Sequence, residues 1–334
     1  MPDFSRPYCS LLDIIDDLET DGRKNIGQAM RFIRAASQVI DKRGKFVPVT
    51  ATRTFTGRLE STLWIDPLLS VSAFTYAGAA LDVNDYALLP HNRLWENGPH
   101  TSIELATLGI WADYPYGNVA ITGQWGLYDG ALDLGLSVTQ DINATTMSFP
   151  TADLISPGCI VRLDGEQEVI EDYAAPSVLN TNLLTADITD SQEDFNITDG
   201  SALSIGEIIR FNHEQLRVRD ISSNSISTVR GWNSTARAAH DLNTAVEVYR
   251  TFNVTRQVNG TAIADHNAAA AERVLPPYDV RYLAEQISAL MLKKGQAGFA
   301  GKTGNAELGE VFYHNEFPKD PIAEIMRGYR IVSI

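Results

Sequence analysis

The sequence is poor in cysteine, has no long apolar stretch and carries fewer basic than acidic residues. Its two cysteines, Cys9 and Cys159, lie far apart in a chain of 334 residues, so we expect reduced core thiols and no disulfide framework. No run of about 18 apolar residues is present. The N-terminus MPDFSRPYCS also lacks the basic and then apolar layout of a signal peptide. We therefore expect no membrane association, and a product that stays in the cytoplasm where it is made.

Basic residues are scarcest in the middle of the chain. The formal net charge is −15, and residues 58–276 hold eleven Lys/Arg against twenty-eight Asp/Glu. A protein that clamps nucleic-acid phosphates needs an excess of Lys and Arg, so this balance argues against specific nucleic-acid binding. Two interpretations of the acidic middle remain open. The acidic residues keep a β-rich region soluble, or they line a channel through which duplex DNA slides by repulsion.

Motifs that would support catalysis or cofactor binding are missing as well. The segment GQAGFAGKTG, residues 295–304, has five residues between Gly295 and Gly301 where a P-loop has four, and it follows a predicted helix instead of a strand. The six histidines have no spacing that suits a zinc site, so we interpret them as surface or turn residues. We predict that the chain is not an enzyme and has no catalytic, cofactor-binding or metal-binding residues.

Apolar residues at steps of three and four predict helices near both ends of the chain. Two helices are expected over 10–18 and 22–42, and a third over 279–293, where Asp279 is a candidate N-cap. Neither end can bury its apolar face alone, so we expect the second and third helices to pack together. The residues predicted at their contact are Ile33, Ile40, Leu283 and Ile287.

From residue 46 the apolar period changes from about four to two. Short runs of β-branched and aromatic residues, such as VPVTATRTFTGR, LLSVSAFTY and NVAITGQWGLY, are separated by Gly, Pro, Asn and Asp. This pattern predicts antiparallel strands joined by hairpins. The fold class that we predict is therefore α+β, with a helical base formed by both chain ends and an antiparallel β region.

An internal repeat follows the first strands. The segment SPGCIVRLDGEQEVIEDY, from Ser156, aligns with SIGEIIRFNHEQLRVRDI, from Ser204, at an offset of 48 residues, with seven of eighteen positions identical. A glycine followed by alternating apolar residues and a polar turn predicts a β-hairpin in each copy. We expect residues 148–173 and 196–221 to be equivalent. They would form either two small β-modules or one pseudo-symmetric barrel, because two copies are too few for a solenoid.

The chain is expected to end in a linker and an arm. Residues 295–309 are rich in glycine and are predicted to be a flexible linker. Residues 311–334 follow as a C-terminal arm with a short helix over 320–328. Apolar tails of this kind add a strand to a partner's sheet or fill its groove, and the alternative is that the tail folds back on its own base. The residues predicted to dock on a partner are Tyr329, Ile331, Val332 and Ile334.

In their order along the chain, several segments resemble the head-tail connector (adaptor) proteins of tailed bacteriophages. These segments are YCSLLDIIDDL, AASQVIDKRGKFVPVTATRTFTG, LWIDPLLSVSAFTYAGAALDVNDYALLPHN, NVAITGQWGLYD, VLPPYDVRYLAEQISALMLKK and DPIAEIMRGYRI. The resemblance covers 1–129 and 274–334, which would form the connector base. Residues 130–273 would be an inserted β domain between two elements that are normally adjacent. Within it, VRGWNSTARAAHDLNTAV resembles a small β-module found in several phage virion proteins.

The resemblance implies a structural role in the virion neck. A connector assembles in the host cytoplasm as a homo-oligomeric ring, of about twelve copies in this family, whose contacts close by rotation. The ring sits under the portal protein, reaches it with the C-terminal arm, holds a downstream neck or tail protein and lets DNA pass through its channel. The alternative is another virion protein, such as a baseplate, fibre-base or decoration subunit that binds capsid or host glycan through the β-repeats. Paired terminal helices favour the connector, because the alternative does not need them.

Overall fold

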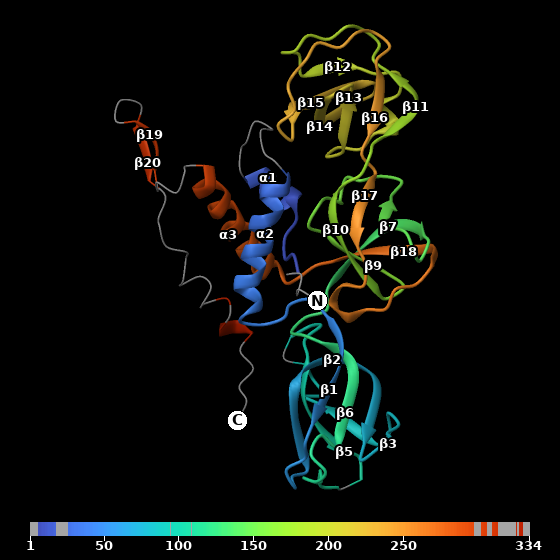
Figure 1. The fold of residues 1–334 in the computed structure, drawn as a ribbon, viewed down its shortest axis with the longest axis vertical. Helices are drawn as coiled ribbons and strands as arrows, with labels where there is room; N and C mark the ends of the chain where they lie inside the picture. The colour runs from blue at the N-terminus through green and yellow to red at the C-terminus, as the bar shows by residue number, and fades with distance from the viewer. Residues whose placement is uncertain are drawn as a thin grey trace.

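The protein is an α+β chain in which three antiparallel β-sheets are stacked along the long axis, with helices beside the middle sheet (Figure 1). The structure is a computed structural model. The residues that it describes are 6–17, 26–93, 95–107, 109–296, 302–305, 309–312, 325 and 327–329. Among these residues, no helix is long and apolar enough to cross a membrane. We call the three parts that carry the sheets the first, middle and upper β units.

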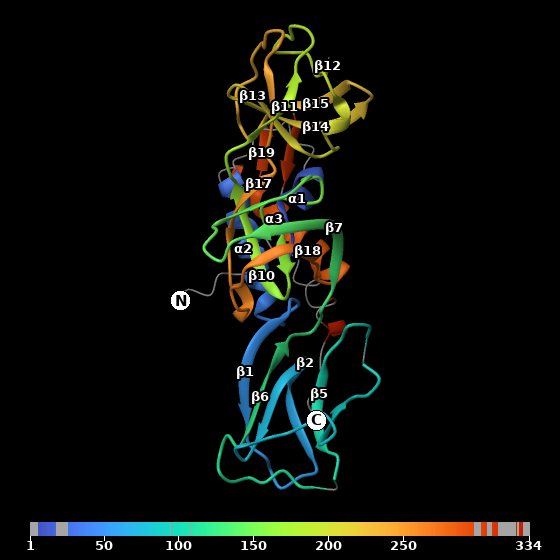
Figure 2. The same ribbon diagram turned by 90° about the vertical axis from the view of Figure 1, so that its right-hand side faces the viewer.

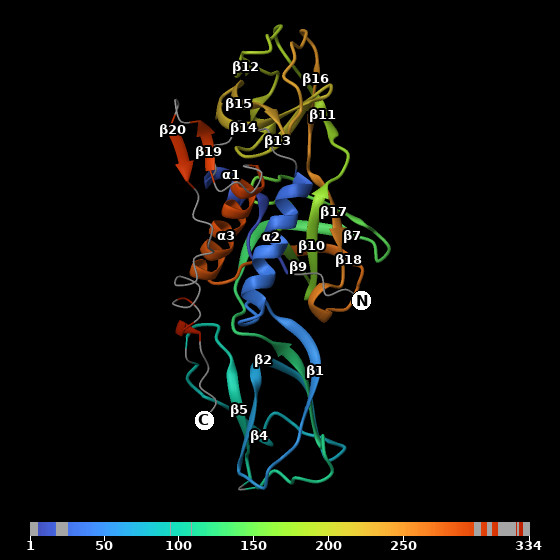
Figure 3. The ribbon, with the colours of Figure 1, turned by 60° about the vertical axis from the view of Figure 1, so that its left-hand side comes forward.

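The helical layer combines both ends of the chain. Its helices are α1 (Leu11–Asp17), α2 (Ile26–Asp41) and α3 (Tyr278–Gln296). The backbone N–H and the hydroxyl of Ser10 donate to Asp13 Oδ2 at 2.7 and 2.8 Å, which caps the start of α1. Helices α2 and α3 pack together and lie side by side in Figure 3. The prediction for this contact is confirmed, since Ile33, Ile40, Leu283 and Ile287 are all buried in one core.

The first β unit lies at one end of the molecule. Its strands are β1 (Val49–Phe55), β2 (Thr62–Tyr76), β3 (Ala79–Ala80), β4 (Tyr86–Leu89), β5 (His100–Leu105) and β6 (Val119–Trp125). They pair in the order β1-β6-β2-β5-β4, with β3 beside β2. Near Leu68, β2 changes partner from β5 to β6. Trp111 and Trp125 fill the core of this unit and are fully buried.

The middle and upper β units have the same strand order. The middle unit contains β7 (Ala131–Gln140), β8 (Thr146–Ser148), β9 (Ile160–Leu163), β10 (Glu166–Tyr173), β17 (Thr251–Thr255) and β18 (His266–Val274). The upper unit contains β11 (Ser177–Leu183), β12 (Asp194–Asn196), β13 (Ile208–Phe211), β14 (Glu214–Ser222), β15 (Ser225–Trp232) and β16 (Ala245–Val248). The orders are β7-β18-β9-β10-β17-β8 and β11-β16-β13-β14-β15-β12. The upper unit therefore lies in the chain between β10 and β17 of the middle unit.

The predicted repeat falls on two hairpins that have the same register. Leu163 pairs with Glu166 in β9–β10, and Phe211 pairs with Glu214 in β13–β14, each 48 residues further along. Gly158 and Gly206 both have a left-handed backbone, with φ of +95° and +97°. Their N–H groups donate at 2.9 Å to the carbonyls of Ile170 and Val218. Because the hairpins belong to two separate sheets, the single barrel that the sequence left open is not what forms.

In each β unit, the chain segment that enters the unit lies beside the segment that leaves it, and a backbone hydrogen bond joins the two. At the first unit, the N–H of Leu127 donates to the carbonyl of Lys45 at 2.7 Å. At the middle unit, the N–H of Leu275 donates to Gly130 at 2.9 Å. At the upper unit, the N–H of Ala174 donates to Thr251 at 2.9 Å, next to the pairing of Ser177 with Val248. The chain thus leaves the helical layer and returns to it through paired segments.

The helices rest on the middle β unit, as Figures 2 and 3 show from two sides. Ile160, Val169 and Val274 of that unit belong to the same core as α1, α2 and α3. The N–H of Leu11 donates to Pro157 at 2.8 Å, and Arg273 Nη2 donates to Asp13 Oδ2 at 3.0 Å. Part of the predicted insertion, 130–273, therefore completes the helical core.

The C-terminal region contains a hairpin where the sequence predicted a structureless linker. Within 295–309, α3 continues to Gln296, and β19 (Lys302–Asn305) pairs with β20 (Gly309–Phe312). β-Branched and aromatic residues at 303, 311 and 312 favour this pairing over a flexible chain. Of the helix predicted over 320–328, the structure describes Ile325, Arg327 and Gly328, and all three are helical.

Candidate functional site

A buried ion cluster closes the upper β unit. Glu214 begins β14, Arg230 lies on β15, and His240 follows in the next loop; their exposed fractions are 1%, 0% and 3%. Arg230 Nε donates to Glu214 Oε1, and Nη2 donates to Oε2, both at 2.7 Å. His240 Nε2 lies 2.9 Å from Oε2 of the same carboxylate. The carboxylate of Glu214 is thus held by the guanidinium of Arg230 on β15 and by the imidazole of His240 in the following loop.

Every N–H donor of Arg230 has a partner. Besides the two bonds to Glu214, Nη1 donates to the carbonyls of Thr189 and Gln192 at 2.9 and 2.6 Å, and Nη2 donates to Ala238 at 2.6 Å. Five donors fixed in one plane are what a guanidinium offers, and here they join two loops to the start of β14. Burial alone would raise the pKa of Glu214, but hydrogen bonds from Arg230, His240 and the N–H of Ala238 outweigh it and lower this pKa.

The middle β unit contains the same arrangement. Glu166 begins β10, Arg256 follows β17, and His266 begins β18. Arg256 Nε and Nη2 donate to the two Glu166 oxygens at 3.1 and 2.7 Å, and Nη2 also donates to the carbonyl of Ala264 at 2.6 Å. His266 Nε2 lies 3.1 Å from Glu166 Oε2. Burial opposes the charge on Glu166, but Arg256, the N–H of Ala264 and His266 together lower its pKa.

The two clusters share a spacing that the sequence analysis missed. Each arginine precedes its histidine by ten residues, and the pattern R-x-x-N-x-T-A-x-A-x-H occurs from Arg230 and again from Arg256. The offset between these copies is 26 residues, whereas the hairpins are offset by 48, so no ungapped alignment joins both halves. His240 and His266 were interpreted as surface or turn histidines, and this was wrong for both. They are buried because a glutamate in each unit accepts from them.

One further carboxylate distinguishes the middle cluster. Glu168, two residues after Glu166, is fully buried, and its Oε1 lies 3.2 Å from Arg256 Nε. Burial raises the pKa of Glu168, against the effect of a hydrogen bond from Gln140. The position that corresponds to Glu168 in the upper unit is Leu216, so the glutamate–arginine–histidine cluster forms without a second carboxylate.

Three side chains of the middle cluster could offer ligands to a metal ion. Ligand atoms of Glu166, Glu168 and His266 lie within 4.8 Å of one another. However, both Glu166 oxygens already accept from Arg256, and backbone N–H groups of Gln257 and Ala264 also donate to them. A guanidinium in contact with both carboxylates repels a cation. The arrangement suits a closed ion network that fixes the fold of each unit, rather than an open metal site.

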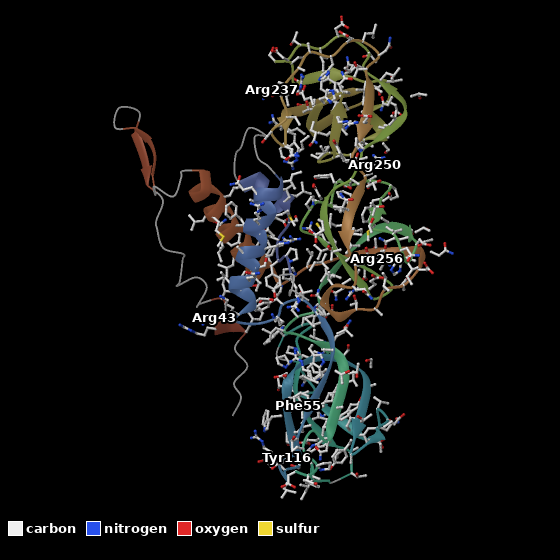
Figure 4. The ribbon with its side chains drawn as sticks, viewed as in Figure 1. Arg43, Phe55, Tyr116, Arg237, Arg250 and Arg256 are labelled. Atoms are coloured by element: carbon white, nitrogen blue, oxygen red, sulfur yellow. The ribbon has the colours of Figure 1, made fainter. Side chains whose placement is uncertain are left out.

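A second candidate is an exposed apolar surface at the far end of the first β unit, where Figure 4 labels Tyr116. We call it the distal face, and it consists of Leu59, Val83, Ile110, Tyr114 and Tyr116. Their exposed fractions run from 60% for Ile110 to 85% for Tyr116. The loops that carry these residues are joined by hydrogen bonds, such as those of 2.9 Å from Leu59 N to Trp111 and from Trp111 N to Glu60. Exposed apolar side chains on loops that are joined by hydrogen bonds are a candidate protein interaction surface.

Of the four residues predicted to dock on a partner, the structure describes Tyr329. Its hydroxyl donates to Asp279 Oδ1 at 2.8 Å, and its ring meets Phe46 and Trp95 edge-on at 5.0 and 5.4 Å between centroids. Burial and the nearby Asp279 raise the pKa of this phenol. Tyr329 is thus packed on its own chain, while Ile331, Val332 and Ile334 lie outside the described residues. Cys9 and Cys159 are buried, as expected of core thiols.

Comparison with known proteins adds no relative, because no protein-family model, no curated protein and no solved structure matches the chain.

Proposed function

We propose that the chain is a non-enzymatic structural subunit of a tailed-phage virion, a head-tail connector that forms a ring under the portal. The observation that carries this proposal is the packing of α2 against α3 in one layer. The resemblance noted in the sequence requires a base built from both chain ends, with β-structure between them. DNA passes through the channel of the ring, and the acidic middle of the chain limits its binding there.

The distal face is the surface that we assign to the downstream neck or tail protein. Its loops carry Arg58 against Glu60, Asp82, Asp85 and Asp113, so the apolar side chains are surrounded by net negative charge. A protein partner with an apolar centre and a basic rim complements such a surface.

We further propose that 130–273 is an inserted domain built from two copies of one β module. Three observations support this proposal: the identical strand order, the equal hairpin register and the matching glutamate–arginine–histidine clusters. A salt bridge of Arg162 with Glu272 at 2.7 Å in the middle unit also has its counterpart in Arg210 with Glu247 at 2.5 Å in the upper unit. The copy in the upper unit would then occupy a hairpin turn of the copy in the middle unit.

We assign the binding of the portal to the C-terminal arm, 311–334. Tyr329 contacts Phe46, Trp95 and Asp279, so the arm is anchored to the base at this residue. Docking through Ile331, Val332 and Ile334 then adds a strand to the portal or fills a groove on it.

Electron microscopy of the purified protein with portal rings tests the proposal. We expect rings of the full chain stacked on the portal, and a chain truncated after Asn315 that keeps its base but no longer binds portal. A matched variant, Tyr329→Phe, keeps the aromatic contacts with Phe46 and Trp95 and loses only the hydroxyl bond to Asp279. This variant should still bind portal. Binding to capsid or host glycan in place of portal would favour a decoration or fibre-base subunit. Persistent portal binding by the truncated chain would show that the C-terminal arm is not the portal-binding segment.

A further inference from the structure

A cavity of about 420 Å³ lies where the upper β unit meets the middle unit and the start of α2. The residues that line it are Ile26, Asp172, Tyr173, Ala174, Ala175, Pro176, Arg210, Gln215, Asn233 and Tyr249. Ala174, Ala175 and Pro176 belong to the segment that joins β10 to β11. Arg210 and Gln215 belong to the β13–β14 hairpin of the upper unit. The cavity therefore belongs to neither ion cluster and not to the distal face.

Two of the lining residues have counterparts in the middle unit, and those counterparts form hydrogen bonds to other segments of the chain. Gln215 corresponds to Gln167 at the offset of 48, and Asn233 corresponds to Asn259 at the offset of 26. Gln167 Nε2 donates to the carbonyl of Pro48 at 3.2 Å, and Asn259 Nδ2 donates to Gln167 Oε1 at 2.7 Å. Asn259 Oδ1 accepts from the guanidinium of Arg6. In the middle unit, this face thus binds a backbone carbonyl and an arginine of the protein's own chain.

In the upper unit, the same face opens on the cavity. Gln215 Nε2 donates to the hydroxyl of Tyr249 at 3.1 Å, and Asn233 Oδ1 accepts from the N–H of Ile26 at 3.2 Å. A carboxylate lies at the rim of the cavity, that of the exposed Asp172. Among the described residues, Asp172 accepts a hydrogen bond from the N–H of Tyr173 at 2.8 Å and from no other group. The face therefore carries the counterparts of both amides, here bonded to Tyr249 and Ile26. The carboxylate of Asp172 lies beside them, and the guanidinium of Arg210, which also lines the cavity, is paired with Glu247.

We propose that this cavity binds an extended peptide segment of a partner protein, through an arginine side chain of that segment. The guanidinium pairs with Asp172 and Asn233, as Arg6 pairs with Asn259 of the middle unit and with Asp41 of α2 (3.0 Å). A backbone carbonyl of the segment accepts from Gln215, as Pro48 does from Gln167. This inference rests on the correspondence of the two units and adds a peptide site that the connector function does not require.

The test uses the unassembled full-length protein without portal, so that its outcome is independent of ring formation. The probe is a fluorescein-labelled peptide with the sequence of residues 2–8, PDFSRPY, and the matched probe has glutamine in place of the arginine. We expect fluorescence polarisation to show saturable binding of the first probe. Binding should weaken at least tenfold, or about 1.4 kcal/mol, for the glutamine probe and for the variants Asp172→Asn and Gln215→Leu. The control variant Asp194→Asn changes an exposed residue of β12 and should bind like the wild type.

Two outcomes would overturn the proposal. One is the absence of saturable binding to a wild-type protein whose circular dichroism shows a folded chain. The other is binding that persists in Asp172→Asn and Gln215→Leu but disappears in Asn259→Leu, because the peptide would then have replaced Arg6 in the middle unit.

Discussion

Glu166 and Glu168 lie two residues apart on β10 and face the same guanidinium, that of Arg256, yet their pKa values move in opposite directions. Arg256 Nη2 is 2.7 Å from Glu166 Oε2, and its Nε is 3.2 Å from Glu168 Oε1. Glu166 gains enough hydrogen bonds to offset its burial, so its pKa is lowered. Glu168 does not, so burial raises its pKa. One strand thus carries a carboxylate that stabilises the fold when ionised and another that destabilises it.

The first prediction is that Glu166→Gln and Glu168→Gln have opposite pH dependence. The depressed pKa of Glu166 stabilises the fold above the ordinary carboxyl pKa of about 4.3, and this contribution is lost as the pH falls through the folded-state pKa. Glu166→Gln should therefore be less stable than wild type at pH 7, by an amount that shrinks in acid. The raised pKa of Glu168 has the reverse effect, because its stabilising, protonated form is lost as the pH rises through the folded-state pKa. Glu168→Gln should therefore gain stability relative to wild type between acid and neutral pH.

Urea unfolding at several pH values measures both differences. Glu171→Gln, a neighbouring substitution in a half-exposed pair with Arg34, serves as the control. A loss of stability at neutral pH in Glu168→Gln equal to that in Glu166→Gln would contradict the assignment.

The second prediction concerns the cluster of the upper unit. Arg230→Leu leaves the carboxylate of Glu214 buried without its cation, which should lower the free energy of unfolding by about 3–5 kcal/mol. Arg210→Leu is the matched control, because Arg210 and Glu247 are both partly exposed and such a pair contributes about 0–1 kcal/mol. Hydrogen exchange should show the loss of protection within 177–248. Equal effects of the two substitutions would mean that the buried cluster does not fix this unit.

The third prediction compares Gly158→Ala with Gly206→Ala. Both glycines have a left-handed backbone, so alanine should cost about 1–2 kcal/mol at either position. At Gly158, the new Cβ would also come within 2.9 Å of Cys9 O and Ser10 Cα, whereas the nearest atom at Gly206 is Asp153 O at 3.5 Å. Thermal unfolding should therefore show the larger loss for Gly158→Ala. A larger loss for Gly206→Ala would contradict the docking of α1 on the turn at Gly158.

The fourth prediction separates the two β units by deletion. Replacing 177–248 by a short Gly-Ser link should leave a folded protein, because Ala174 and Thr251 are already joined by a hydrogen bond of 2.9 Å. Removing 131–272 tests the proposal of an insertion, since Gly130 and Leu275 are joined in the same way. The second deletion also removes Ile160 and Val169 from the helical core, so we expect a base that is folded but less stable.

Circular dichroism and urea unfolding of the two deletion variants provide the measurement. Loss of helical signal after removal of 177–248 would show that the upper unit is part of the base. Loss of that signal after removal of 131–272 alone would show that the helices fold only on the middle sheet.

Local patterns were enough to predict the three helices and the two repeated hairpins, but not the hairpin of β19 and β20. The face of α2 with Ile33 and Ile40 repeats at helical spacing, and Gly158 and Gly206 mark equivalent turns, so each signal lies within a few residues. The middle ion cluster could not be predicted in this way, because Glu166 lies 90 residues from Arg256, with the whole upper unit between them. In the upper cluster, Glu214 and Arg230 are 16 residues apart, and the spacing shared by the two clusters was the signal that was missed. His240 and His266 carry no sign of burial until the glutamates that face them are known. The packing of Tyr329 on Phe46 joins two residues from opposite ends of the sequence, so no local pattern indicates it.

The paired segments at the ends of each β unit also determine how the molecule would carry a pull along its long axis. At each junction, 45 with 127, 130 with 275 and 174 with 251, the backbone crosses twice. A pull between the distal loops of the first unit and the far end of the upper unit has one covalent path, which runs through 127–130 and 174. The second segment at each junction shares this load through hydrogen bonds and packing. A subunit with this chain path would therefore stiffen under load only as far as these paired segments stay bonded to each other.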